Sequence, residues 1–127
     1  TWCSNIFSIP VIGHGDGGVY PTAADMGRFW KALFSRTYFD AEMLTRMTTR
    51  HVPTSPESSG HYGYGVWIDE IAGRTCFSVV GEDPGVEFYS GYFPDENLQI
   101  TLLANTNHAL WPMVRVIRNE ILDLDQA

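Results

Sequence analysis

The sequence predicts an α+β domain in which helices pack on an antiparallel meander sheet of about four strands. Aromatic and β-branched residues, which favour strands, gather in four short runs at residues 62–68, 75–80, 85–93 and 98–105. Turn-forming residues separate the runs at 69–73, 81–85 and 94–97. Parallel crossovers need a dozen or more residues, so connections this short favour antiparallel pairing of consecutive strands.

The chain is short and acidic. Its 127 residues, of which 44% are hydrophobic and 13% aromatic, suffice for a single domain with one core. The net charge is −7 and the 8 basic residues are scattered, whereas a nucleic-acid surface needs clustered Lys and Arg. No apolar run approaches the roughly 20 residues of a membrane-spanning helix. We therefore expect neither nucleic acid nor a membrane as a partner.

Residues 1–21 are predicted to form an irregular arm and a glycine-rich loop. The arm lacks the basic and apolar regions of a signal peptide, and Pro10 limits residues 7–12 to an edge strand or an extended segment. Residues 13–18 formally match G-x-G-x-x-G. A dinucleotide site would need a clean strand before this motif and a helix directly after it, and Asp40 would have to end a second strand. The sequence therefore favours a tight loop over a nucleotide-binding loop.

Residues 22–50 are predicted to form two helices. Thr22 and Asp25 have the spacing of a capping box, which starts the first helix. The expected buried stripe of this helix consists of Met26, Phe29, Trp30 and Leu33. Asp40 is the predicted N-cap of the second helix, which is expected to run to about Arg50. The expected buried face of the second helix consists of Met43, Leu44 and Met47.

The sheet, predicted over residues 62–105, is flanked by a loop and a last helix. The loop at residues 52–60 is rich in proline and serine. The helix is predicted over residues 110–124, where Pro112 fits the first turn because its missing N–H would have no partner there. The expected apolar face of this helix consists of Val114, Ile117, Ile121 and Leu124.

The side chains that commonly bind metals show no recognisable site. They are His14, His51, His61, His108, Cys3 and Cys76, and none has the tight pair spacing of a structural zinc site. We therefore expect no metal and no cofactor, and we interpret both cysteines as free thiols. The aromatic residues of the strands are interpreted as core and cross-strand packing.

Four segments carry further motifs, in this order along the chain. They are GGVYPTAADM at residues 17–26, YGYGVW at 62–67, the stretch GEDPGVEFYS at 81–90, and PDENL leading into LAN at 94–105. Together they resemble motifs of the serine β-lactamase-like superfamily, which includes class C β-lactamases, penicillin-binding proteins and related esterases and peptidases. The resemblance covers nearly the whole chain. It implies the C-terminal part of the β-lactamase/transpeptidase-like fold.

The resemblance also implies what this chain lacks. The family's nucleophile is a serine in Ser-x-x-Lys, where the lysine helps to activate the hydroxyl. Lys31 is the sole lysine and Arg28 stands three residues before it, so the motif is absent, as are Tyr-x-Asn and Ser-x-Asn. These motifs belong to the N-terminal and central parts of family members. The chain is therefore expected to be a C-terminal fragment of a larger serine hydrolase and to be inactive alone.

The family's third motif, Lys-Thr-Gly or His-x-Gly, lies on the strand that lines the substrate cleft, and here it falls on residues 79–81. Gly81 matches the glycine, but Val79 replaces the cation or imidazole. The resemblance implies that the backbone N–H of Glu82 is one donor of the oxyanion hole. The other implied cleft residues are Val80, Asp83, Pro84 and Gly85. Of the two adjacent carboxylates, Glu82 rather than Asp83 is expected to face the cleft.

The missing cation argues against β-lactam turnover and favours an esterase, a peptidase or another hydrolase that acts on an acyl or amide small molecule or on a peptide. Two alternatives stay open at this point. One is a non-catalytic binding or dimerisation module of the same fold, and the other is a nucleotide-binding protein that uses residues 13–18.

The last predicted strand, residues 98–105, implies a further partner. In the family this strand lies beside strands of the N-terminal part, and an uncovered edge would be a template for pairing with another chain. We therefore expect the missing N-terminal part, a second copy of the chain or the arm at residues 7–12 to cover this edge.

Overall fold

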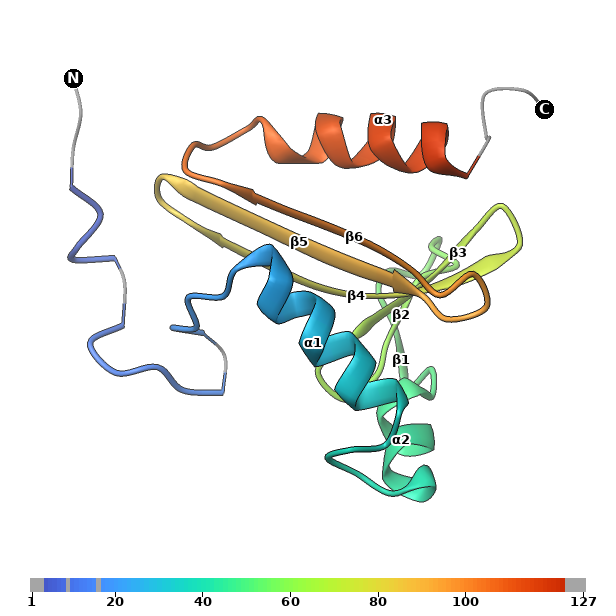
Figure 1. Ribbon diagram of the computed structural model, residues 1–127. Coiled ribbons are helices and arrows are strands. Elements are labelled where there is room, and N and C mark those ends of the chain that lie inside the picture. The colour runs from blue at the N-terminus through green and yellow to red at the C-terminus, as the bar shows by residue number, and fades with distance from the viewer. Residues whose placement is uncertain (1–3, 9, 16, 123–127) are drawn as a thin grey trace.

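The computed structural model describes residues 4–8, 10–15 and 17–122 and shows a six-stranded antiparallel sheet flanked by helices (Figure 1). The strands, in sheet order, are β1 (Val52–Pro53), β2 (His61–Tyr62), β3 (Trp67–Ile71), β4 (Arg74–Asp83), β5 (Val86–Phe93) and β6 (Leu98–Ala104). The helices of the described residues are α1 (Ala23–Phe34), α2 (Ala41–Thr48) and α3 (Leu110–Ile121). The predicted α+β class and the antiparallel meander are confirmed, but the sheet has six strands instead of about four.

The prediction of one strand over residues 62–68 is wrong, because the chain reverses inside this stretch. β2 ends and β3 begins on either side of a tight loop, and the two strands pair with each other. The Gly63 N–H donates to the Val66 carbonyl over 2.8 Å, and Gly65 has a φ of 81°, a conformation that favours glycine. The two glycines therefore form a hairpin loop between aromatic neighbours.

The predicted turn at residues 69–73 is also shorter than expected. β3 continues to Ile71, so that the turn consists of Ala72 and Gly73 alone. Both residues have positive φ values, 51° and 76°, as in the two-residue turns whose twist matches that of paired strands.

β4 extends the sheet into a second predicted turn, residues 81–85. It runs through Asp83 instead of ending at Val80, because each added residue pairs with β5. The turn that remains consists of Pro84 and Gly85, and Gly85 has the positive φ of 83° that the second central position of a type II turn requires.

α1 begins with the predicted capping box. The Thr22 hydroxyl accepts a hydrogen bond from the Asp25 N–H over 3.2 Å, and the Asp25 carboxylate accepts one from the Thr22 N–H over 2.8 Å. The Thr22 hydroxyl, which also donates to this carboxylate, is the main cause that lowers the pKa of Asp25 to about 2. The predicted stripe is confirmed, with Met26, Trp30 and Leu33 buried and Phe29 packed against the same core.

α2 begins after its predicted N-cap, Asp40, whose carboxylate accepts a hydrogen bond from the Met43 N–H over 2.8 Å. The helix ends at Thr48, slightly before its predicted end. The prediction of a buried face is wrong at Met43, which is 40% exposed, while Leu44 and Met47 pack against the core. α2 lies beyond the end of α1, beside β1 and β2 (Figure 1), where little of the sheet is left to cover.

α3 covers the face of the sheet opposite to α1 (Figure 1). Val114 is buried as predicted, and Ile117 packs at the margin of the same core. The prediction is wrong at Ile121, which is 48% exposed, and Leu124 lies outside the described residues. The chain leaves the helix after Ile121, and Leu122 turns back into the core instead.

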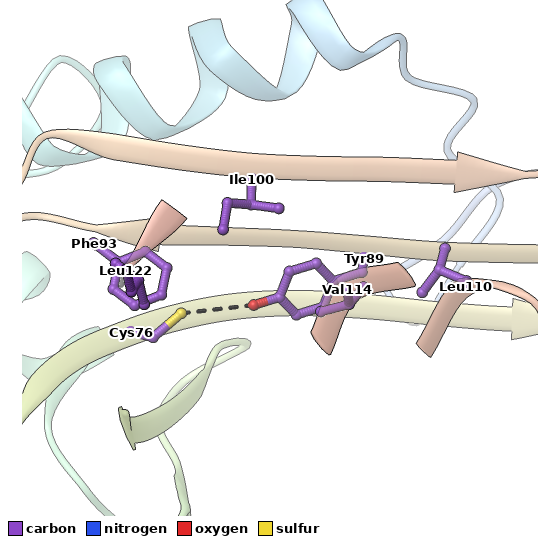
Figure 2. Close-up of a cluster of buried hydrophobic side chains, with 7 residues drawn as sticks. All are labelled: Cys76, Tyr89, Phe93, Ile100, Leu110, Val114 and Leu122. Carbon is purple, nitrogen blue, oxygen red and sulfur yellow. Dashed lines mark hydrogen bonds between the residues drawn. The ribbon is translucent and has the colours of Figure 1, made fainter. Parts of the chain in front are cut away.

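Two buried clusters hold the three layers together. The cluster between α3 and the sheet, drawn in Figure 2, consists of Cys76, Tyr89, Phe93, Ile100, Leu110, Val114 and Leu122. Figure 2 shows the Tyr89 hydroxyl directed at the Cys76 thiol, 3.7 Å away, and burial raises the pKa of that thiol to about 11. The cluster on the α1 side consists of Trp30, Leu33, Val66, Ile68 and Phe77.

Hydrogen bonds between buried side chains also tie α1 to the sheet. The Trp30 indole N–H donates to the Ser90 hydroxyl of β5 over 2.8 Å, and this hydroxyl lies 2.7 Å from that of Thr101 on β6. The Trp30 ring stacks on Tyr92, with 5.8 Å between the ring centroids. A buried indole N–H needs such a partner, so Ser90 fixes the position of the helix along the strand.

β6 is the last strand of the sheet, and its outer side pairs with no strand of the described residues. The prediction that residues 7–12 cover this edge is wrong, since Phe7 and Val11 are almost fully exposed. The arm lies beyond one end of the sheet (Figure 1), where the Asn5 side chain donates to the Pro84 carbonyl over 3.0 Å. The arm is thus held at the β4–β5 turn, and its described residues form no strand.

We predict an alternating pattern of hydrogen exchange along β6. The residues that flank the two-residue β4–β5 turn form a hydrogen-bonded pair, and the alternation continues from there through β5 into β6. The N–H groups that point away from the sheet are those of Gln99, Thr101 and Leu103. In NMR-detected exchange these amides should exchange as fast as loop amides, and those of Ile100 and Leu102 slowly. Protection of all five amides would contradict an open edge and indicate a second copy.

Candidate active-site strand

β4 has a strand on only one side along the segment from Val79 to Asp83, which we call the open segment. β3 pairs with β4 from Arg74 to Ser78 and no further, because the chain turns away before Trp67. β5 pairs with β4 as far as Asp83. Within the described residues, no strand covers the other side of the open segment. The predicted site residues Val79, Val80, Gly81, Glu82 and Asp83 make up this segment.

The strand register determines which backbone groups face the uncovered side. Counting back from the two-residue turn, Gly81 and Val79 form hydrogen-bonded pairs with β5. Val80 and Glu82 belong to the alternate pairs, so their N–H and C=O groups point away from β5. The Glu82 N–H therefore points to the side of β4 that another molecule can approach.

Side chains of the open segment alternate between the two faces of the sheet. Val79 packs against the core under α1, so Gly81 and Asp83 lie on that face as well. Val80 and Glu82 lie on the α3 face. The structure thus brings the predicted residues together on one strand but divides their side chains between two layers.

A hollow of about 340 Å³ lies where the open segment meets the arm. It is lined by Phe7, Ser8, Pro10, His14, Gly17, Gly18 and Asp83. Asp83 lines this hollow, whereas the Glu82 side chain lies on the other face of the sheet, and the expectation that Glu82 rather than Asp83 faces the substrate cleft stays a prediction.

The glycine-rich loop that borders this hollow is a tight turn, as the sequence favoured. The His14 N–H donates to the Gly17 carbonyl over 2.9 Å, and the Gly17 N–H donates back over 3.1 Å. Gly18 has a φ of 90°, and a Cβ on it would lie 2.5 Å from the Gly13 Cα. The described residues before Gly13 form no strand and α1 starts only at Ala23, so the requirements of a dinucleotide motif are not met.

Asn107, which the sequence analysis did not single out, braces the end of the open segment. Its side-chain oxygen accepts a hydrogen bond from the Gly85 N–H over 2.7 Å, and its side-chain nitrogen donates to the Asp83 carbonyl over 3.2 Å. Pro84, the remaining predicted cleft residue, accepts the bond from Asn5. Both sides of the turn are therefore held by residues far away in the sequence.

Glu87 is a second residue that the sequence analysis missed. It lies opposite Glu82 in the register but is only 3% exposed, because its carboxylate accepts hydrogen bonds from the His108 N–H (2.6 Å) and the Leu110 N–H (2.9 Å). The N–H of Leu110 is the main cause that lowers the pKa of Glu87. The carboxylate thus caps α3, whose own N-cap residue, Ala109, provides no side-chain hydrogen bond.

Other candidate groups contribute little to this site. His51 stacks on Tyr64 with 4.2 Å between ring centroids, and Tyr62 packs edge-on against Trp67 across the β2–β3 pair.

Among the residues that the structure describes, no group of three His, Cys, Asp or Glu side chains is placed to hold a metal ion. In the same residues, no helix is both long and apolar enough to span a membrane.

Comparison with protein families identifies one match over almost the full chain. The model of the family described as beta-lactamase matches residues 4–124. No curated protein matches the chain at a significant level.

The fold is also similar to parts of several solved structures. A penicillin-binding protein from Bacillus halodurans is 36% identical, with a TM-score of 0.83 over 93% of this chain and 36% of that one. A D-stereospecific amidohydrolase from Streptomyces sp. is 25% identical, with a TM-score of 0.60 over 65% of this chain and 25% of that one. A D-amino acid amidase from Ochrobactrum anthropi shares the fold, with 18% identity and a TM-score of 0.61 over 79% of this chain and 34% of that one. The chain thus spans only a minor part of each of these proteins.

We predict that replacement of Glu87 by Gln makes the stability of the domain less dependent on pH as the pH falls below the ordinary carboxyl pKa of 4.5. The pKa of Glu87 is lower in the folded state than its ordinary value of 4.5, so the unfolded chain takes up the proton first. The stabilisation is present above the unfolded pKa and is lost as pH falls through the folded pKa. Urea unfolding at several pH values should therefore show a smaller acid-induced loss for Glu87→Gln than for the wild type. An unchanged slope would contradict this role, and the matched control is Glu57→Gln in an exposed loop.

Proposed function

The chain belongs to the β-lactamase family, and we propose that it is the C-terminal portion of a serine hydrolase that contributes the cleft-lining strand and one oxyanion donor. The observation that carries this proposal is the open segment of β4, along which the Glu82 N–H points away from β5. A backbone donor does not depend on the side chain, so this role is compatible with glutamate at the position. The chain alone is inactive in this proposal, since it holds no Ser-x-x-Lys.

In the proposed reaction the nucleophile is a serine hydroxyl from the upstream part of the protein. Its oxygen adds to the carbonyl carbon of the substrate while a base takes its proton, and the π electrons of the carbonyl move to the oxygen. That oxyanion accepts a hydrogen bond from the Glu82 N–H. When the intermediate collapses, the bond to the amine or alkoxide breaks and the leaving group takes the proton from the base. Water then adds to the acyl-enzyme, which releases the acid and restores the hydroxyl.

The proposed substrates are acyl or amide small molecules, or peptides. Val79 supplies no charge on the face where a motif lysine or imidazole would stand, so the open segment has no cation for a substrate carboxylate. The 25% identity to an amidohydrolase from Streptomyces sp. supports an amide bond as the target. These observations favour amide or ester hydrolysis over turnover of a β-lactam, whose carboxylate would have no cationic partner on the open segment.

We further propose that the upstream part of the protein pairs with the outer edge of β6. This edge is unpaired in the described residues, and Leu103 near its end is 48% exposed. The chain covers only 36% of the penicillin-binding protein that it matches over 93% of its own length, so a longer partner segment is available in such proteins. If no upstream part is attached, a second copy of the chain would pair with the same edge of β6.

Labelling with a fluorescent phosphonate tests the proposed function. A longer form of the protein that includes the upstream region should be labelled on a serine of Ser-x-x-Lys, as read by peptide mass, whereas the 127-residue chain alone should not be labelled. Heat-denatured protein is the control for unspecific reaction. A folded longer form that is never labelled would overturn the proposal in favour of a non-catalytic module, and labelling of the short chain would contradict its inactivity.

The role of the Glu82 N–H predicts that Glu82→Pro lowers kcat of the longer form by about 10²–10³-fold, the usual cost of one oxyanion donor. Proline removes the N–H, and the register indicates that this N–H takes no part in the ladder with β5, so the strand loses no hydrogen bond. Glu82→Ala removes the side chain but keeps the donor and should stay within a few-fold of the wild type. Circular dichroism verifies the fold of both variants. Equal losses in the two variants would contradict a backbone role.

A further inference from the structure

Asp83 is the one acidic side chain of the open segment on the face of the sheet that carries Val79. It is half-buried and lines the hollow beneath the arm. No hydrogen bond or ion pair involves its carboxylate within the described part of the chain, although its backbone carbonyl is held by Asn107. Other carboxylates of the domain pair with arginine, and these are Asp25, Glu42, Glu70 and Glu96.

The surroundings of this carboxylate favour a cation as its partner. Among the described residues that line the hollow there is no lysine and no arginine, and His14 is the only other titratable one. Val79, which lies four residues before Asp83 on the same face of the sheet, is uncharged. A partly buried carboxylate loses part of its hydration, which a cationic ligand with N–H donors restores.

We propose that Asp83 is a specificity-determining residue whose carboxylate binds the free α-ammonium group of an amino-acid amide or of a peptide N-terminus. This inference rests on the proposed function, because it places the scissile carbonyl at the Glu82 N–H. The hydrolase then prefers substrates with a cationic amine next to the scissile carbonyl over the same substrates with an acylated amine.

The geometry of the strand is compatible with this arrangement. Glu82 and Asp83 are consecutive residues, and one residue advances a strand by about 3.3 Å. In an amino-acid amide the ammonium group and the carbonyl group are attached to neighbouring carbon atoms. A substrate whose carbonyl oxygen accepts a bond from the Glu82 N–H can therefore place its ammonium group at the next residue of the strand. The acid that remains after hydrolysis keeps this ammonium group, and ammonia or an amine leaves.

The test uses the longer form of the protein with its upstream region and two substrates, phenylalanine amide and N-acetylphenylalanine amide, each as the D and the L isomer. The wild type should hydrolyse the free amine with the higher kcat/KM. Asp83→Asn should lower kcat/KM for the free amine by about 10- to 100-fold, mainly through KM, as expected for a lost hydrogen bond between charged groups. The same variant should lower the value for the acetylated amide far less than that for the free amine.

Two further variants keep this test independent of folding and of the proposed function. Asp83→Glu retains the charge and should restore part of the preference, whereas Asp95→Asn, in the exposed turn between β5 and β6, should not alter it. A loss of kcat/KM by the same factor for both amides would show a merely structural role and overturn the inference. Hydrolysis without any preference in the wild type would overturn it too and leave the proposed function intact. A form that hydrolyses neither amide and is not labelled by the phosphonate would overturn both.

Discussion

The unequal pairing of β4 is the constraint on which the rest of the structure depends. β5 accompanies this strand to its end, whereas β3 leaves it after Ser78. A strand with one free side is usually a liability, because its backbone groups can pair with another chain. Here the ladder to β5 and the two helical layers keep the strand extended, while one side stays accessible. Rigid backbone with outward N–H groups is what recognition of a developing negative charge requires.

Residues that follow β6 hold the end of the open segment in place. Asn107 bonds to the turn after the segment, and Glu87, on the neighbouring strand, caps the helix that follows Asn107. The segment, β5 and α3 thus form one connected unit. α3 covers the core of Figure 2 and its first turn is bonded to Glu87 of β5, while Asn107, in the loop before α3, holds the last residue of β4.

Local patterns allowed part of this structure to be predicted from the sequence. The capping box of Thr22 and Asp25 and the stripe under α1 depend only on residues close in sequence, and both are confirmed. The extension of β4 to Asp83 was missed because residues 81–85 have turn chemistry, which cross-strand pairing overrides. The carboxylate of Glu87 finds its partners more than twenty residues away, so no local pattern reveals them. One hint was available: a charged residue two positions before Tyr89 interrupts an otherwise apolar strand face.

The burial of Cys76 under α3 has a practical consequence. Thiol reagents attack the thiolate, and burial both blocks access to this sulfur and holds its pKa near 11. At neutral pH the Cys76 thiol is therefore unreactive while α3 is packed on the sheet. It becomes reactive only when α3 separates from the strands beneath it. The alkylation rate of Cys76 thus reports how often α3 separates from the sheet. It does not report motions of α1 around Trp30 on the opposite face.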